Sequence, residues 1–383
     1  MTLRLSTLAA SLLLASHAFL CTAQAQTPEA DPVVLKFSTV GDSRQDPVGF
    51  DPTMGPLSEQ DKIWLQNSKA FSRILRDIEG QKAKILFFNG DMIMGYGSAG
   101  ATAGTSVEEV VKSDLMAFYR QYGFWRGMVA PTMESGTYIV PVPGNHEVQS
   151  KPLGKKAIVE NENAWRANMG DLIIDTARFK AIVGKDAQHI NTKNNGALDG
   201  LTSDQTQLSY SFDVEDNHFA VVNTDPVGKD NIAPAAWLAK DFSEAKARGA
   251  KHFFAFGHKP AYTYYYGKGD KPAPGIAGLD KFPENRDGMW NVIEQYSATY
   301  FCGHEHVFNM AQPKGHAWQV LVGSGGSPWE ATPGEDTLAP DTDRAYAWAT
   351  VSVRKSGKVD IDAYGFSADF GPTKLLKHVT LAH

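Results

Sequence analysis

Six side chains of types that bind metals stand at widely separated points of the sequence, five of them immediately after a glycine and the sixth three residues after one. They are Asp42, Asp91, Asn145, His258, His304 and His306. Carboxylate, amide and imidazole groups together form an oxygen and nitrogen shell that suits Mn, Zn or Fe ions. The chain has only two cysteines, so a zinc site built from thiolates is excluded. The residue types therefore predict metal chemistry, provided that these positions meet in space.

Each of these positions closes a short run of β-branched and aromatic residues, which is typical of a buried strand. The runs span residues 33–40, 85–88, 138–142, 253–256 and 298–302. Loops that follow the carboxyl ends of neighbouring strands gather along one edge of a sheet, where α/β folds place their sites. We therefore expect the six side chains to converge at such an edge.

Helical patterns alternate with these strands. A helix capped by Ser58 is expected to end near Gly80, and further helices are expected over residues 107–122 and 234–248. More strands are expected at residues 208–214, 218–223, 318–322, 345–353 and 359–365. This order predicts an α/β fold of two packed sheets with helices outside.

The motifs themselves resemble a known family. Gly41-Asp42, Gly90-Asp91, Gly144-Asn145-His146-Glu147, Gly257-His258 and Gly303-His304-Glu305-His306 are similar to the five ordered blocks of the calcineurin-like metallophosphoesterase superfamily. Two of the blocks, taken with their neighbouring residues, are similar to sequence motifs of purple acid phosphatases: Gly257-His258-Lys259-Pro260 and Cys302-Gly303-His304-Glu305-His306. The resemblance implies a four-layer sandwich of two mixed β-sheets flanked by helices, with residues 33–383 as a single domain.

The resemblance also implies roles for the residues. Asp42 and His306 would bind a first metal, Asp91 would bridge two metals, and Asn145, His258 and His304 would bind the second. A hydroxide held between two divalent or mixed-valence ions (Mn, Zn or Fe) would then attack the phosphorus of a phosphoester. His146 would protonate the leaving group or donate a hydrogen bond to it, and Glu147 and Glu305 would orient the ligands.

The sequence departs from the family pattern at the first metal. Many members have a histidine ligand two residues after the first aspartate, where this chain has Arg44, which cannot ligate a metal. Purple acid phosphatases supply a tyrosine three residues after the bridging aspartate, where this chain has Met94. Three alternatives stay open: Tyr96 fills the gap as a ligand, water or substrate completes the open site, or Arg44 acts as a catalytic residue that gives the phosphate a fixed positive charge and paired donors.

The first residues predict export. Arg4, an apolar stretch from Leu5 to Leu20 and the small-residue pattern Ala23-Gln24-Ala25 indicate a signal peptide over residues 1–25, followed by a short lead-in over residues 26–32. We therefore expect a secreted or periplasmic protein whose mature chain has no membrane span. A formal net charge of −6 gives no electrostatic case for binding nucleic acid.

The function predicted from the sequence is hydrolysis of a small-molecule phosphomonoester or phosphodiester. The alternative is a non-catalytic or single-metal member of the same fold that binds phosphate or metal, which the Arg44 substitution would permit. Plainer interpretations exist for single motifs, since Gly-Asp is a common turn and histidines are often half-buried without a ligand. Neither the natural substrate nor the oligomeric state can be predicted from the sequence.

Overall fold

Two large mixed β-sheets form the centre of the protein. The computed structural model describes residues 31–45, 64–264, 266–267, 271–272, 278–327 and 343–381. Within them, the first sheet has the spatial order β17 (Lys374–Leu381), β16 (Val359–Phe366), β15 (Tyr346–Arg354), β1 (Val33–Val40), β2 (Ile85–Phe88) and β3 (Tyr138–Pro141). The second has the order β13 (Phe308–Ala311), β14 (Trp318–Val322), β12 (Thr299–Cys302), β9 (His252–Gly257), β8 (Asn217–Val222), β7 (Tyr210–Val214) and β6 (Gln188–Asn191).

The strands that precede the candidate ligands run parallel to one another within each sheet. β1, β2 and β3 form one parallel set, and β14, β12, β9 and β8 form the other. Antiparallel strands complete both sheets, with β15 beside β1 and β7 beside β8. Because parallel strands end at a common edge, the loops after β1, β2, β3, β9 and β12 are brought close together.

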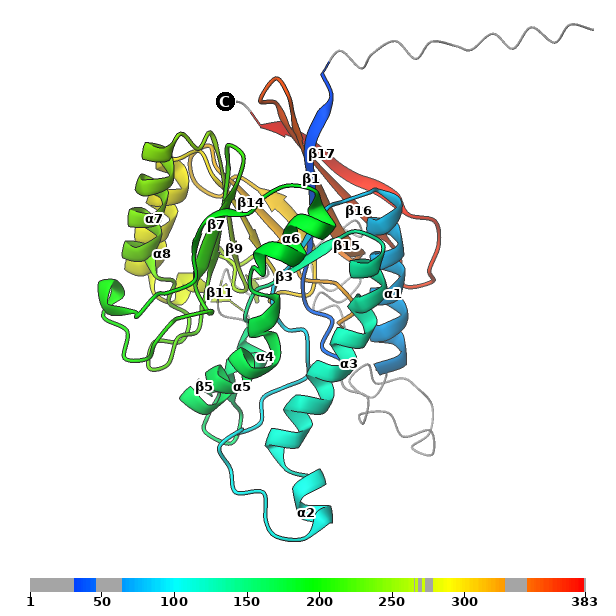
Figure 1. Ribbon diagram of the computed structural model, residues 1–383, viewed down its shortest axis with the longest axis vertical. Helices are drawn as coiled ribbons and strands as arrows, with labels where there is room; N and C mark the ends of the chain where they lie inside the picture. Colours follow the sequence, from blue (N-terminus) through cyan, green and yellow to red (C-terminus); the bar gives the residue numbers. More distant parts are fainter. Residues whose placement is uncertain are drawn as a thin grey trace, which may run out of the picture.

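Helices cover the outer faces of the sandwich (Figure 1). α1 (Trp64–Gly80), α3 (Asp114–Glu134) and α5 (Val159–Met169) lie on the side of the first sheet, and α7 (Ala235–Arg248) and α8 (Pro283–Gln295) cover the second. The other described elements are short: α2 (Val107–Val111), α4 (Asn145–Val148), α6 (Thr176–Val183), β4 (Gln149–Ser150), β5 (Lys156–Ala157), β10 (Tyr266–Gly267), β11 (Lys271–Pro272) and 3-10 turns at Gly170–Leu172, Ala197–Asp199 and Leu279–Lys281. The predicted sandwich of two mixed sheets flanked by helices is confirmed.

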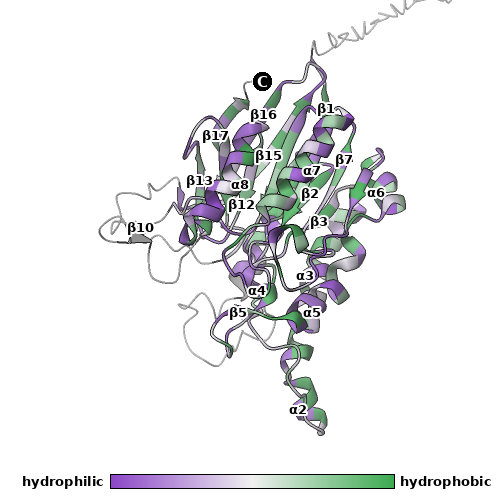
Figure 2. Ribbon diagram, turned by 90° about the vertical axis from the view of Figure 1, so that its left-hand side faces the viewer, coloured by the Kyte–Doolittle hydropathy of each residue, from purple (hydrophilic) through white to green (hydrophobic). Residues whose placement is uncertain are grey.

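Three hydrophobic cores hold these layers together, and the central one is strongly aromatic. Between the sheets, the rings of Phe87 and Phe256 stack with centroids 3.7 Å apart, and Phe37 meets Phe254 edge to face at 4.9 Å. Apolar residues dominate the central strands, whereas polar residues appear on the outer surfaces of the helices (Figure 2). Aromatic pairs of this kind add about 0.5–1.5 kcal/mol beyond their buried area, so they stabilise the packing of one sheet against the other.

The predicted helices are partly right. The helix expected over residues 234–248 is α7, which ends at Gly249 in the left-handed region at φ 102°. The single helix expected over residues 107–122 is wrong, because Ser113 caps a new helix by accepting a hydrogen bond from the backbone N–H of Met116. The expected start at Ser58 lies outside the described residues, as does the predicted signal peptide. Every described helix is too short or too polar to span a lipid bilayer.

Candidate metal centre

In the part of the chain that the structure describes, two groups of metal-ligand side chains lie at the edge where these strands end, and they share one residue. Asp91, His258 and His304 form one group, and Asp42, Asp91 and His306 form the other. Within each group the ligand atoms lie within 4.8 Å of one another. The carboxylate of Asp91, which follows β2, therefore lies between side chains that follow β1, β9 and β12.

The backbone at these positions is unusual. Asp42, Asp91 and His304 all have positive φ angles, of 63°, 51° and 73°. Non-glycine residues in this region cost roughly 1–3 kcal/mol each, and such strain gathers at functional sites. At each of these three residues the chain turns away from the direction of its strand, and the side chains of Asp42, Asp91 and His304 point into a common space.

The glycines of the motifs are required by close packing. A Cβ atom at Gly144 would overlap the backbone nitrogen of Asp91, and one at Gly303 would overlap the carboxylate of Asp42. Each loop therefore approaches its neighbour more closely than any residue with a side chain would allow. This explains why glycine precedes Asn145 and His304.

The first half of the centre is built around Asp42, which is completely buried. Its two carboxylate oxygens accept the backbone N–H of His304 at 3.1 and 3.0 Å. The Nε2 atom of His306 lies 3.6 Å from Asp42 Oδ1. With Asp91, this half offers two carboxylates and one imidazole.

The second half adds an amide oxygen. Asn145 Oδ1 lies 2.7 Å from His258 Nε2 and 2.9 Å from His304 Nδ1. His258 Nε2 is also 3.2 Å from Asp91 Oδ1, and its Nδ1 donates to the carbonyl oxygen of Asn89 at 2.8 Å. The bond to Asn89 leaves Nε2 facing the other ligand atoms, which is how metal-binding histidines are usually oriented.

The electrostatics of this half fit a cation. Burial alone would lower the pKa of His258, but the carboxylates of Asp91 and Asp42 outweigh it and raise the pKa to about 10. Burial would raise the pKa of Asp91, yet the imidazoles of His146 and His258 hold it well below its ordinary value. The carboxylates thus draw positive charge into a buried space, and the donors present are those that suit Mn, Zn or Fe.

Glu147 stabilises the two loops that carry Asp91 and Asn145. Its carboxylate accepts the backbone N–H groups of Gly144, Asp91, Met92 and Ile93 at 2.8–3.2 Å. Burial and the neighbouring Asp91 carboxylate raise the pKa of Glu147 to about 7, against the effect of these donors. One buried side chain therefore joins the loop after β2 to the loop after β3. Glu305, on another loop, accepts the N–H of Tyr264 at 2.8 Å.

His146 lies beside the two groups with a defined orientation. Its Nδ1 donates to the carbonyl oxygen of Met94 at 2.5 Å, and its Nε2 lies 3.5 Å from Asp91 Oδ2. Burial, more than the opposing Asp91 carboxylate, lowers the pKa of His146 to about 3. The imidazole is therefore neutral, with an unprotonated Nε2 at the centre.

Arg44 and Tyr96, the two residues considered for the first metal, make different contacts. Arg44 Nη2 is 3.5 Å from the sulfur of Met94, and the Arg44 backbone is left-handed at φ 43°. The hydroxyl of Tyr96 accepts a hydrogen bond from the amide nitrogen of Asn145. Tyr96 thus contacts a residue of the second half of the centre.

A buried ion pair next to His258 in the chain was not predicted from the sequence. Lys259, directly after His258, lies 2.6 Å from Asp225 Oδ1 and donates to Asn231 Oδ1 at 2.7 Å. All three side chains are buried. Asp225 follows β8 just as the other motifs follow their strands, so the pattern of a strand ending in a polar residue would have found it.

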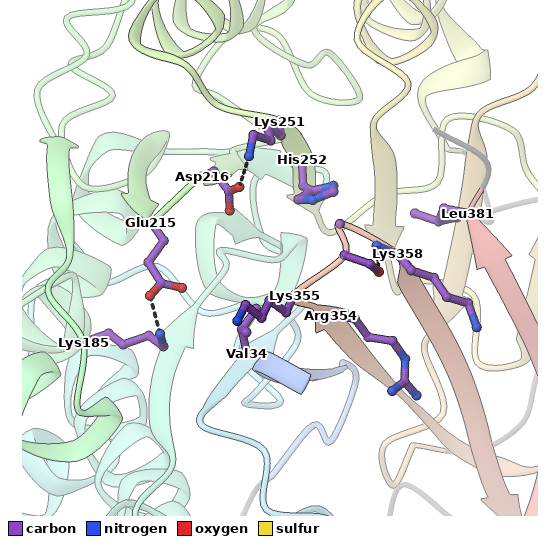
Figure 3. Close-up of a pocket in the computed structure, with 12 residues that line it drawn as sticks. Val34, Lys185, Glu215, Asp216, Lys251, His252, Arg354, Lys355, Lys358 and Leu381 are labelled. Atoms are coloured by element: carbon purple, nitrogen blue, oxygen red, sulfur yellow. Dashed lines mark hydrogen bonds and ion pairs between the residues drawn. The ribbon is translucent and has the colours of Figure 1, made fainter. Parts of the chain in front are cut away.

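A large groove lies elsewhere, beside the first residues of β1 and β9, and Figure 3 shows the side chains that line it. It measures about 870 Å³ and is lined by Val34 and by His252, the first residue of β9. Since strands rise about 3.3 Å per residue, Val34 lies roughly 20 Å from the end of β1. Four of its five lysine and arginine side chains are ion-paired: Lys185 with Glu215, Lys251 with Asp216, and Arg354 and Lys358 with Asp360. The groove is therefore separate from the metal-ligand groups.

Known proteins share this architecture. Residues 63–308, more than half of the chain, match the family described as calcineurin-like phosphoesterase. A purple acid phosphatase from yellow lupin (Lupinus luteus) seeds is 12% identical with a TM-score of 0.54, over 90% of this chain and 53% of the lupin chain. This chain thus spans about half the length of the lupin enzyme.

A dimetal phosphatase from Danio rerio is 10% identical with a TM-score of 0.53, over 91% of this chain and 99% of the other. At these identities the two structures show a common fold and nothing finer. No curated protein matches the sequence.

Proposed function

Because this chain belongs to the calcineurin-like phosphoesterase family, whose members are hydrolases acting on phosphoric ester bonds, we propose that it hydrolyses a small-molecule phosphomonoester or phosphodiester at a site for two metal ions. The observation that carries the proposal is the position of Asp91, which belongs to both ligand groups. A shared carboxylate is the feature that distinguishes a two-metal site from two separate single-metal sites.

Each side chain has a role in this proposal. Asp42 and His306 hold the first ion, and Asn145, His258 and His304 hold the second. When bound, the ions supply Lewis acidity toward phosphate oxygens and lower the pKa of a coordinated water. The residues of this chain fix where the substrate phosphorus lies and which face of it is open to attack.

His146 is proposed to serve the leaving group. Its Nδ1 is committed to Met94, so only Nε2 can exchange a proton in the site. A phosphate adds negative charge that favours protonation of Nε2, from which the proton can pass to the leaving oxygen.

Export remains part of the proposal. The signal-peptide pattern over residues 1–25 supports a secreted or periplasmic enzyme that acts on extracytoplasmic phosphoesters.

A second candidate function is a single-metal or non-catalytic binder. It is favoured by Arg44, since among the described residues the first half of the centre offers only Asp42, Asp91 and His306 as side-chain ligands. The two candidates differ in one measurable property, which is turnover.

The test is hydrolysis of nitrophenyl monoesters and diesters with Mn²⁺ or Zn²⁺ added, with and without a chelator. Asp91→Ala and Asn145→Ala should abolish turnover, whereas Asp186→Ala, which alters an exposed aspartate paired with Lys180, should leave it unchanged. Turnover that survives both site changes would reject the mechanism. A wild-type protein that binds metal without turnover would favour the binder.

A further inference from the structure

We propose that Tyr96 is a positioning residue of the metal centre, holding the amide of Asn145 through its hydroxyl and the imidazole of His146 through its ring. The inference rests on the proposed function, because it assigns Tyr96 a part in placing one metal ligand and the leaving-group histidine. It concerns a residue that the sequence alone offers only as a substitute ligand for the first metal.

The contact with Asn145 sets which end of the amide faces the metals. The amide nitrogen donates to the Tyr96 hydroxyl, so Oδ1 is left facing His258 and His304. Only the oxygen of an amide can ligate a cation, since the nitrogen carries two hydrogens and no available lone pair. Without the hydroxyl, the buried amide nitrogen loses its partner and the orientation of Asn145 is no longer held from that side.

The contact with His146 is made by the ring. The ring centroids of Tyr96 and His146 are 3.8 Å apart, at an angle of 41° between the planes. The same short segment holds His146 through its backbone: Tyr96 N–H donates to the His146 carbonyl at 3.0 Å, and the Met94 carbonyl accepts from His146 Nδ1. A Cβ atom at Gly95 would collide with the His146 carbonyl oxygen, so this close approach requires glycine there.

The backbone of Tyr96 is consistent with such a role. Its φ angle is 62°, in the left-handed region that tyrosine rarely adopts. The strained turn sends the side chain toward Asn145 and His146.

Two substitutions separate the two contacts. Tyr96→Phe keeps the ring beside His146 and removes the hydroxyl, and Tyr96→Leu removes both. Tyr119→Phe is the matched control, because Tyr119 is 44% exposed on α3 and loses the same atom away from the centre. Thermal unfolding of each metal-free variant checks that the fold is intact.

The hydroxyl is tested by calorimetric titration of metal-free protein with Zn²⁺. Tyr96→Phe should weaken one of two binding steps by about 10–100-fold, the range for the loss of a group that orients a ligand, and leave the other step unchanged. Tyr119→Phe should bind as the wild type does. Wild-type affinities in Tyr96→Phe, or the complete loss of one bound ion as expected for a direct ligand, would overturn the hydroxyl's role.

The ring is tested by turnover at saturating metal. Relative to Tyr96→Phe, Tyr96→Leu should lose more kcat on an alkyl phosphate such as glycerol 2-phosphate than on nitrophenyl phosphate, because an alkoxide leaving group needs a proton more than a nitrophenolate does. Equal losses on both substrates would overturn the ring's role. If the wild type turns over neither substrate, the proposed function fails, while the titration still decides the contact with Asn145.

Discussion

His258 Nε2 lies 3.2 Å from Oδ1 of Asp91. This contact joins the end of β9 in one sheet to the end of β2 in the other. Both side chains are buried, and Nδ1 of His258 is held by the Asn89 carbonyl. Without metal, both nitrogens of the ring donate hydrogen bonds, so His258 is an imidazolium beside a carboxylate. A metal ion at this place would take over the charge that the proton now supplies.

Metal binding should therefore release a proton from His258. The carboxylates of Asp91 and Asp42 raise its pKa to about 10, so near pH 7 its Nε2 is protonated and must lose that proton to bind a metal. The affinity should fall about tenfold for each pH unit below 10 from this group alone. Calorimetric titration with Zn²⁺ in two buffers of different ionisation enthalpy measures the proton count.

In the same experiment, His258→Ala should release about one proton fewer than the wild type. A wild-type protein that binds metal with no proton release would contradict the charge assigned to His258.

His146→Ala should separate proton transfer from metal binding. Turnover of an alkyl phosphate should fall by about 10²–10⁴-fold, and turnover of nitrophenyl phosphate should fall much less, because the better leaving group needs less help from a proton. Metal content should stay at the wild-type value, since His146 belongs to neither ligand group. Loss of metal in this variant would contradict a role confined to the leaving group.

Arg44→Ala should weaken the binding of phosphate. If the guanidinium donates to substrate oxygens, its removal should raise KM, lower kcat or both, and Arg44→Lys should restore only part of the loss because an ammonium cannot form the paired bonds. Arg178→Ala, which alters a partly exposed arginine paired with Asp171, serves as the control for loss of charge. Kinetics of Arg44→Ala equal to those of the wild type would remove Arg44 from the catalytic residues.

Away from the centre, stability should depend on pH through His218. This fully buried histidine lies between Asp213, at 2.5 Å, and Asp241 on α7, at 2.8 Å. Burial lowers its pKa, but the two carboxylates outweigh burial and raise the pKa above 6.5. His218→Gln leaves two buried carboxylates without their shared cation and should cost roughly 3–5 kcal/mol.

Because the pKa of His218 is raised in the folded protein, its contribution to the free energy of unfolding falls as the pH rises. The contribution of His218 is fully present below its unfolded pKa of about 6.5 and is lost as pH rises through its higher folded pKa. The difference in unfolding free energy between wild type and His218→Gln should therefore be larger at pH 6 than at pH 9.5, as measured by urea unfolding. His378→Gln, which breaks an exposed pair with Asp362, should cost less than about 1 kcal/mol. A constant difference for His218→Gln across this range would contradict the charged cluster.

Much of the fold could be predicted from the sequence because the strands that carry the motifs are buried on both faces. Such strands appear as continuous apolar runs, and the run at residues 253–256 is β9 to within one residue at each end. α8 gave a weaker signal, because Asn285, Asp287 and Gly288 interrupt its apolar positions. β17 was missed because its side chains are partly exposed and lack a clear alternation.

The meeting of Asp91 with His258 and His304 could be anticipated because each follows the end of a predicted strand, and the structure brings these side chains together. Their service as metal ligands stays a prediction. The contacts of His146 could not be foreseen, because one partner is a backbone carbonyl, which carries no signature in sequence. The position of the Tyr96 ring depends on a left-handed turn that non-glycine residues rarely make.

Metal stoichiometry of the purified mature protein and its variants tests the shared carboxylate most directly. Elemental analysis after metal loading should find two ions per chain in the wild type and one in His306→Ala. Asp91→Ala should retain no tightly bound ion, because both halves of the centre lose the same side chain. A wild type that holds one ion or none, or an Asp91→Ala variant that keeps two, would contradict a centre built on Asp91.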